Sequence, residues 1–301
     1  MKTAGTSTGT RIALKNILYL TDFSEASQAA LPFAVAMVRE FGGTIHALHV
    51  MMPEALTYMS PDTIGIAIEA QEEAADAGMR RVGAQLNGAA HDVSVMRAAS
   101  VWQAVEQAIA DCETDLIVLG TQGRTGVPKL LMGSIAEEIF RRSPVPVLTI
   151  GPWARGGAHN AAQFHRVLFA TDFSAEAVAA SGYAISLAEE HAARLILLNV
   201  IHTRVPDSDA GRVQTSVAHV MYELHEIVPQ NAELWCRPEA VVEHGDPAAR
   251  ILEVARLRGA DLIVLGVRSA AGSLGAATHL ERAVAHKVVA HAACPVLTVR
   301  G

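Results

Sequence analysis

Short apolar segments alternate along the chain with longer segments in which apolar and polar residues recur at helical spacing. In the first half, the segments that predict strands lie at residues 17–20, 44–50, 92–96, 116–119 and 145–150. The segments that predict helices lie between them, at residues 24–41, 62–86, 101–110 and 134–142. Because strands that alternate with helices pair in parallel through right-handed crossovers, the pattern predicts a parallel sheet. The strands are apolar almost throughout, which indicates that helices cover both faces of the sheet.

The second half of the sequence repeats this order of elements. The segment KNILYLTDFS at residues 15–24 returns as HRVLFATDFS, DLIVLG at 115–120 returns at 261–266, and PVLT at 146–149 returns at 295–298. A repeat of this length indicates a duplicated domain and not a solenoid. The stretch between the copies is rich in glycine and alanine, as linkers often are. We therefore predict a first domain at residues 12–150, a linker at 151–162 and a second domain at 163–300.

In the second copy, strands are expected near residues 167, 195–200, 241–243, 262–265 and 296–299. Pro238 interrupts the region of the third of these strands, because proline cannot donate a ladder hydrogen bond.

Composition and charge narrow the class of protein. The net charge is −7, so the sequence has no electrostatic footprint for nucleic acid. The three cysteines show no CxxC spacing and cannot all form disulfides with one another. We therefore expect free thiols in a reducing compartment. The N-terminus lacks an apolar signal core, and no apolar run is long enough to span a membrane. We expect a cytoplasmic protein with neither nucleic acid nor membrane as a partner.

One stretch at residues 116–134, LIVLGTQGRTGVPKLLMGS, predicts a strand, a glycine-rich loop and the start of a helix. Glycines allow the backbone to approach a ligand, and the first amides of a helix favour an anion such as phosphate. The stretch contains neither a Walker A sequence nor GxGxxG. In an open parallel sheet, ligands bind beyond the carboxyl ends of the strands. That edge gathers Thr21-Asp22, Val50 and the glycine-rich loop, so we expect a nucleotide whose phosphates lie on the loop.

These residues resemble the universal stress protein family, with two Usp domains in tandem. The motifs that carry the resemblance are LTDFS at residues 20–24, His49-Val50, Gly120-x2-Gly123-x9-Gly133-Ser134, and PVPVL at residues 144–148. The resemblance implies two Rossmann-like open parallel five-stranded sheets of the adenine nucleotide alpha hydrolase-like type, with the strand order 3-2-1-4-5. It also implies that the glycine-serine spacing marks the ATP-binding branch of the family.

By this resemblance, the first copy binds ATP, with Mg or Mn on the phosphates. The residues expected to line the adenosine side are Leu20, Thr21 and Asp22; Val50 would contact adenine through its backbone, and Leu119 and Gly120 would flank the ribose. The residues expected to hold the phosphates are Gly123, Gly133, Ser134 and Ile135. Arg124 and Lys129 lie in the loop, where they would touch the outer phosphates or remain solvated. Leu20 stands where the family often has proline.

The second copy departs from the motif. Thr171, Asp172 and Gly266 remain, but Ser269 replaces the second glycine. The position of Gly133-Ser134 is taken by Arg282-Ala283 or His279-Leu280, depending on the direction of alignment. We predict that this copy binds nucleotide weakly or not at all.

Each of these residues also has a purely structural interpretation. Asp22, Asp172 and Ser134 are of the types that cap helices or form turns. The thirteen histidines are scattered without HExxH spacing, so no metal site is expected.

Three functions stay open on the sequence. The leading hypothesis is a stress-response binding module regulated by nucleotide, since the sequence shows no GxSxG elbow or paired carboxylates beside the loop. The alternatives are a slow ATPase or nucleotide-dependent enzyme, and an adaptor that binds no nucleotide. The resemblance further implies that the two domains pair within the chain, with residues 145–150 facing residues 296–300, and that tandem chains can form a homodimer.

Overall fold

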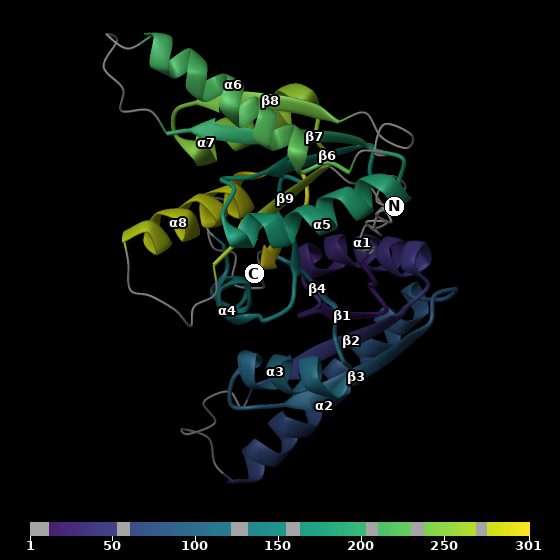
Figure 1. Ribbon diagram of the computed structural model, residues 1–301. Helices are drawn as coiled ribbons and strands as arrows, with labels where there is room; N and C mark the ends of the chain where they lie inside the picture. The colour runs from purple at the N-terminus through teal and green to yellow at the C-terminus, as the bar shows by residue number, and fades with distance from the viewer. Residues whose placement is uncertain are drawn as a thin grey trace, which may run out of the picture. The chain divides into compact units, whose positions relative to one another are not determined.

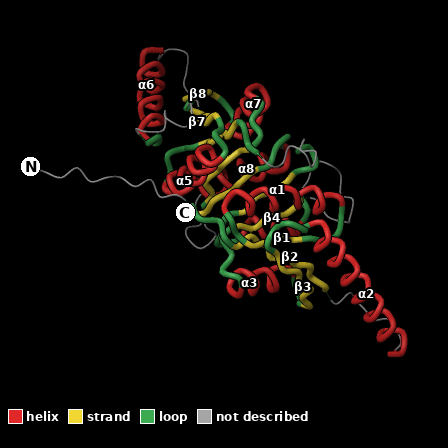
Figure 2. The backbone as a smooth tube through the Cα atoms, turned by 90° about the vertical axis from the view of Figure 1, so that its right-hand side faces the viewer, coloured by secondary structure: helices red, strands yellow, loops and turns green. Residues whose placement is uncertain are grey.

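The structure is a computed structural model that describes residues 12–52, 61–121, 132–154, 163–202, 210–229, 238–268 and 276–301. The chain forms two compact units. We call the first-copy unit the one built from residues 14–163 and 269–298, and the second-copy unit the one built from residues 1–13, 164–268 and 299–301. Each contains strands packed against helices (Figure 1; Figure 2). Within the described ranges, no helix is long and apolar enough to cross a membrane.

The sheet of the first-copy unit has the strand order β3-β2-β1-β4-β5-β10. These strands are β1 (Asn16–Leu20), β2 (Thr44–Met51), β3 (His91–Arg97), β4 (Leu116–Gly120), β5 (Val147–Ile150) and β10 (Val296–Arg300). Strands β1 to β5 are all parallel. The predicted order 3-2-1-4-5 is confirmed, and the predicted strand ends differ from the observed ones by at most two residues.

The helices of this unit begin and end where local chemistry favours it. They are α1 (Glu25–Phe41), α2 (Pro61–Gln85), α3 (Val101–Asp111), α4 (Ser134–Arg142) and α8 (Ala276–His291). The Ser24 hydroxyl accepts a hydrogen bond from the Ser27 amide and caps α1, and Gly42 ends that helix with a φ of 65°. Helix α1 packs on β1 and β4, α2 packs on β2 and β3, and α3 contacts α4. As the apolar pattern predicted, consecutive residues of β1 and β4 are buried on both faces of the sheet.

Strand β10 comes from the second sequence copy and pairs antiparallel with β5. Leu297 lies opposite Leu148 at the centre of this pairing. Two buried threonines flank the centre symmetrically: the Thr149 hydroxyl donates to the Val296 carbonyl over 3.0 Å, and the Thr298 hydroxyl donates to the Val147 carbonyl over 3.3 Å. Because each hydroxyl has a partner, these polar groups are buried without a large desolvation cost.

The second-copy unit repeats the topology of the first. Its sheet has the order β9-β6-β7-β8, in parallel. The strands are β6 (Arg166–Ala170), β7 (Arg194–Ile201), β8 (Glu239–His244) and β9 (Leu262–Val267), and the helices are α5 (Ala175–Glu190), α6 (Ala210–Glu226) and α7 (Pro247–Arg258). Pro238 directly precedes β8, where it removes no ladder hydrogen bond.

Candidate functional site

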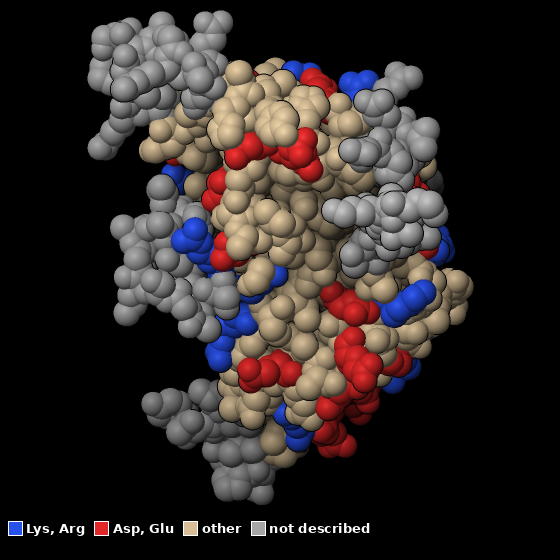
Figure 3. Space-filling model, in the orientation of Figure 1, with Lys and Arg blue, Asp and Glu red and all other residues tan. Residues whose placement is uncertain are grey.

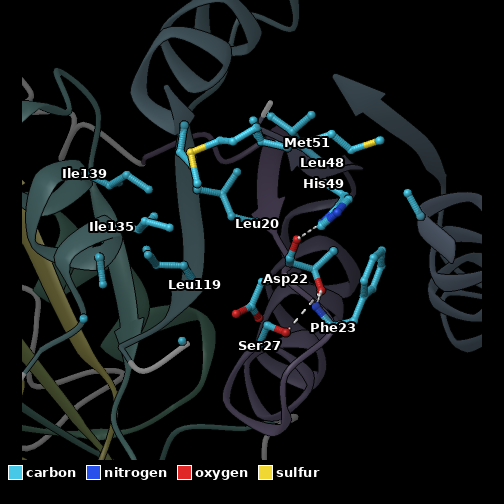
Figure 4. A pocket seen from close by; sticks show the side chains of 18 of the residues that line it. Leu20, Asp22, Phe23, Ser27, Leu48, His49, Met51, Leu119, Ile135 and Ile139 are labelled. Carbon is cyan, nitrogen blue, oxygen red and sulfur yellow. Dashed lines mark hydrogen bonds between the residues drawn. The ribbon is translucent and has the colours of Figure 1, made fainter. Parts of the chain in front are cut away.

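A cavity of about 500 Å³ opens at the carboxyl ends of β1, β2 and β4 in the first-copy unit (Figure 4). Nine of the predicted site residues line it: Leu20, Thr21, Asp22, Val50, Leu119, Gly120, Gly133, Ser134 and Ile135. Gly123, Arg124 and Lys129 lie outside the described residues. The segments that the sequence gathers at one edge of the sheet therefore meet around a single space.

The turn after β1 carries Asp22 into the cavity wall. Its Oδ1 atom accepts a hydrogen bond from the Ser24 amide over 3.0 Å, and the Thr21 hydroxyl accepts one from the Phe23 amide over 3.0 Å. Between these bonds, Phe23 has a φ of 64°, a left-handed conformation that is strained for a bulky residue. Asp22 thus has the turn-forming role of its structural interpretation and also lines the cavity.

His49, at the end of β2, ties this turn to the next strand. Its Nδ1 lies 2.8 Å from the Thr21 carbonyl oxygen, so this nitrogen carries the proton and donates it. Its ring lies 4.3 Å from the Phe23 ring, centroid to centroid. On the other side of Phe23, Gly78 of α2 leaves room for the aromatic ring, since a Cβ there would lie 2.4 Å from its tip. The turn, β2 and α2 are therefore packed as one wall.

Gly120 has a packing role that the sequence did not reveal. A Cβ on Gly120 would lie 2.4 Å from the Ala26 carbonyl oxygen, in the first turn of α1. In the second copy, a Cβ on Gly266 would lie 2.5 Å from the Ala177 amide nitrogen of α5. The same close approach of strand and helix occurs in both copies, so glycine at this position serves the fold whether or not a ligand is bound.

The start of α4 differs from the other helix starts whose caps the structure describes. Helices α1, α3, α5 and α7 each have a side-chain cap, from Ser24, Ser100, Ser174 and Asp246. The N-cap of α4 is Gly133, which has no side chain to offer. Ser134, predicted as a phosphate ligand or a cap, is the first helical residue and lines the cavity instead of capping the helix. The amides of the first turn of α4 are thus the groups that an anion in this cavity would meet.

The electrostatics of the cavity come from few groups. Among the described residues, Asp22 supplies the one carboxylate on its wall, and no lysine or arginine lines it. Beneath the cavity wall, burial raises the pKa of Tyr19 to about 12. Hydrogen bonds to Thr21 and Ser27 lower this pKa in part, and the charge of Asp22 raises it slightly further. Tyr19 therefore stays a hydrogen-bond donor at physiological pH. Figure 3 shows a face on which acidic and basic side chains both occur.

Several lining residues were missed by reasoning from the sequence. Helix α2 contributes Gln71, Ala74 and Ala75, and the end of β2 and the residue after it contribute Met51 and Met52. The spacing of the α2 residues places them on one helix face, but the alanine-rich sequence did not indicate which face turns to the cavity. Ser27, His49 and Thr121 also line the wall; His49 was quoted as part of a motif but was not assigned to the site.

The chemistry that this cavity can support is binding of a partly apolar ligand that carries an anionic group. Most of its wall is apolar, one end carries the α4 amides, and Asp22 can accept hydrogen bonds from hydroxyl groups. No group of three or more metal-ligating side chains occurs among the described residues. A cation on an anionic ligand would have to come from solution or from residues 122–131, which the structure does not describe.

In the second copy, the corresponding turn has the same hydrogen bonds. Thr171 accepts from the Phe173 amide over 2.9 Å, and Asp172 accepts from the Ser174 amide over 3.0 Å. The Asn199 amide donates to the Thr171 carbonyl over 2.9 Å, as His49 does in the first copy. Ser269 and the side chains of His279, Leu280, Arg282 and Ala283 lie outside the described part of the chain, so the predicted loss of the phosphate site there stays a prediction.

Comparison with known proteins fits this geometry. The model of the universal stress protein family matches the chain twice, at residues 13–151 and 163–300. A universal stress protein of Mycolicibacterium smegmatis is 24% identical over 295 residues, which cover 94% of this chain and 96% of that protein. One from Thermus aquaticus is 35% identical over 46% of this chain and 99% of its own length. A crystal structure of a universal stress protein from Archaeoglobus fulgidus has the same fold, with a TM-score of 0.67 at 23% identity, over 96% of this chain and 97% of that one. The chain belongs to the universal stress protein family, as two Usp domains in tandem.

Proposed function

We propose that the first-copy unit binds ATP and acts as a nucleotide-dependent regulatory module in a stress response. The observation that carries this proposal is the meeting, in one cavity, of Asp22 with the start of α4, whose N-cap has no side chain. A carboxylate suits ribose hydroxyls, and helix amides suit phosphate. The two features lie on one cavity of a size that suits a small-molecule ligand.

The parts of ATP have distinct places in this proposal. The apolar wall near Leu20 and Val50 takes the adenine, with the Val50 backbone as its hydrogen-bonding partner. Asp22 takes the ribose beside Leu119 and Gly120. The phosphates lie at Gly133, Ser134 and Ile135, with Gly123 and Arg124 of the loop around them and Mg or Mn as their counter-ion.

Calorimetric titration of the full chain with ATP tests this directly, with GTP and adenosine as comparison ligands. We expect one ATP per chain, weaker binding of adenosine because the α4 amides then have no anion, and a requirement for Mg or Mn. Mass spectrometry of protein denatured after gentle purification identifies any nucleotide that was carried along. Saturation at two ATP per chain would contradict the assignment to the first copy. Absence of both binding and carried nucleotide would favour the adaptor hypothesis.

Whether bound ATP turns over separates a regulatory module from a slow ATPase. We expect ATP to bind without sustained hydrolysis. A multiple-turnover assay of phosphate release with purified protein tests this. Robust phosphate release that Asp22→Asn abolishes would favour the enzyme.

We further propose that the two Usp domains pair within one chain through β5 and β10. The antiparallel register of these strands and their buried threonines support this pairing. Light scattering tests the additional expectation of a homodimer of tandem chains, and cell fractionation tests a cytoplasmic location.

A further inference from the structure

Three hydroxyl groups lie buried behind the turn that carries Asp22. The Tyr19 hydroxyl donates to the Ser27 carbonyl over 2.7 Å. The Thr21 hydroxyl donates to the Ser27 hydroxyl over 3.2 Å, and the Ser27 hydroxyl donates to the Ser24 carbonyl over 2.9 Å. Tyr19 and Ser27 are 0% and 4% exposed. We call these three side chains the hydroxyl chain.

The hydroxyl chain links both sides of Asp22. Thr21 directly precedes Asp22. Ser24 lies two residues after Asp22, and its carbonyl oxygen accepts the hydrogen bond from the Ser27 hydroxyl. The Thr21 hydroxyl also accepts from the Phe23 amide, so the peptide groups next to Asp22 cannot rotate without breaking these bonds. Ser27 itself lines the cavity, and Figure 4 draws it with Asp22 at the wall. The hydroxyl chain is therefore placed to fix the direction of the Asp22 carboxylate.

The second copy shows that the fold does not require the hydroxyl chain. Phe169 stands in the place of Tyr19, and Ala177 stands in the place of Ser27. The turn nevertheless forms with the same backbone, since Phe173 has a φ of 62° against 64° for Phe23. A buried hydroxyl is costly unless it is bonded, and its net contribution to stability is small even then. Because the turn forms without the Tyr19 and Ser27 hydroxyls, their presence in the first copy points to the ligand.

We propose that Tyr19 and Ser27 are positioning residues that hold the Asp22 carboxylate in the direction in which it accepts the ribose hydroxyls. This inference rests on the proposed function, that the cavity binds ATP. Ser27 acts through the turn and Tyr19 acts through Ser27, so the effect of Ser27 is the larger. A group that is already fixed before binding loses less freedom when the ligand arrives, which strengthens binding.

The test replaces each residue by its counterpart from the second copy, in the full chain. Ser27→Ala and Tyr19→Phe are titrated with ATP and with 2′,3′-dideoxy-ATP. The second ligand lacks the ribose hydroxyls that would donate hydrogen bonds to Asp22. We expect Ser27→Ala to weaken ATP binding about tenfold and Tyr19→Phe about threefold. Binding of 2′,3′-dideoxy-ATP should change by less than about twofold. In an Asp22→Asn background, Ser27→Ala should have no further effect on ATP binding.

A matched control is available in the second-copy unit. The Ser181 hydroxyl donates to the carbonyl three residues earlier, as the Ser27 hydroxyl does. Ser181→Ala should leave the binding of both ligands unchanged. Because the second copy folds with Phe169 and Ala177, we expect the variants to fold, and circular dichroism with thermal unfolding checks this.

The outcomes separate the two proposals. An unchanged ATP affinity in Ser27→Ala would overturn the positioning role while leaving ATP binding intact. Equal losses for ATP and 2′,3′-dideoxy-ATP would also overturn it, because the effect would then not pass through the ribose. If the unaltered chain binds neither nucleotide, the proposed function fails first, and the positioning role fails with it.

Discussion

The turn after β1 and the turn after β6 have nearly the same backbone but different surroundings. Both place phenylalanine in a left-handed conformation, and both use threonine and aspartate to accept backbone amides. Behind the first turn lie the hydroxyls of Tyr19 and Ser27, whereas Phe169 and Ala177 stand in those places behind the second. What the two copies share is needed by the fold, and what only the first copy has is the better guide to a ligand.

This comparison divides the residues of the glycine-rich motif into two groups. Gly120 and Gly266 both allow a helix start to approach a strand closely, so glycine here belongs to the shared scaffold. Gly133 and Ser134 begin α4 at the cavity and have no counterpart in the sequence of the second copy. A motif that resembles a ligand-binding signature can therefore contain positions that the fold needs whether or not a ligand is bound.

The largest expected effect concerns the shared glycines. Gly120→Ala and Gly266→Ala should each lower the free energy of unfolding by about 3 kcal/mol, because the new Cβ meets helix backbone that cannot move away easily. Gly182→Ala, in α5, is the matched control, since a Cβ there has no neighbour within 4 Å. It should stabilise the protein by about 0.5–1 kcal/mol. Denaturant unfolding measures all three variants. A large loss for Gly120→Ala with no loss for Gly266→Ala would break the proposed equivalence of the two positions.

The next largest effect concerns Asp22 and Asp172, the aspartates at equivalent positions of the two copies. Asp22→Asn keeps a side-chain oxygen that can accept the Ser24 amide but removes the charge. It should therefore weaken ATP binding by about 2 kcal/mol, or roughly thirtyfold, with little change in stability. Asp172→Asn makes the same change in the second copy and should leave ATP binding unaltered. Calorimetric titration compares the two. If both variants lost affinity equally, the assignment of nucleotide to the first copy alone would be wrong.

Much of this site follows from the sequence, because topology decides which segments meet. Parallel strands bring their carboxyl ends to one edge, and that is enough to gather Asp22, Val50 and Ser134. The wall from α2 could not be predicted, since its alanines give no clear apolar face and Gln71 is as common on a surface as in a site. The packing role of Gly120 depends on a distance to Ala26 that no local pattern encodes.

The grouping of elements into units was only partly an expectation, since the resemblance implied that residues 145–150 face residues 296–300 but said nothing of α8. The repeat places α8 and β10 in the second domain, whereas α8 and Val296–Thr298 of β10 group with the first-copy unit. A sequence repeat shows which segments of the chain are duplicated, but it does not show which segments pack into the same core. The predicted domain limits therefore remain a statement about the sequence, while the two units are a statement about contacts.

A smaller effect concerns the side chain that ties the turn to the next strand. His49 and Asn199 both donate to the carbonyl of the threonine that precedes the aspartate. His49→Ala should cost about 1–2 kcal/mol of stability, because the buried Thr21 carbonyl loses its side-chain donor. His49→Asn should restore most of this, as it copies the second unit. Thermal unfolding distinguishes the variants. Equal losses for both would show that the contact of the His49 ring with Phe23 matters more than the hydrogen bond.

The smallest effect is the pH dependence that Tyr19 brings to the first copy, where the second copy has Phe169. Burial raises the pKa of Tyr19 from 10.0 to about 12, so between these values the folded state keeps a proton that the unfolded state has lost. The stability due to the neutral tyrosine is fully present below about pH 10 and is lost as the pH rises towards 12. Between pH 9 and pH 11, the unaltered protein should lose about 1 kcal/mol more stability than Tyr19→Phe does. Denaturant unfolding at several pH values measures the difference, in which the titration of other groups cancels. Parallel curves for the two proteins would mean that Tyr19 ionises as easily in the folded state as in the unfolded one. Burial, the largest cause of the raised pKa, would then not act on the Tyr19 hydroxyl, and the hydroxyl chain would lose its buried outer member.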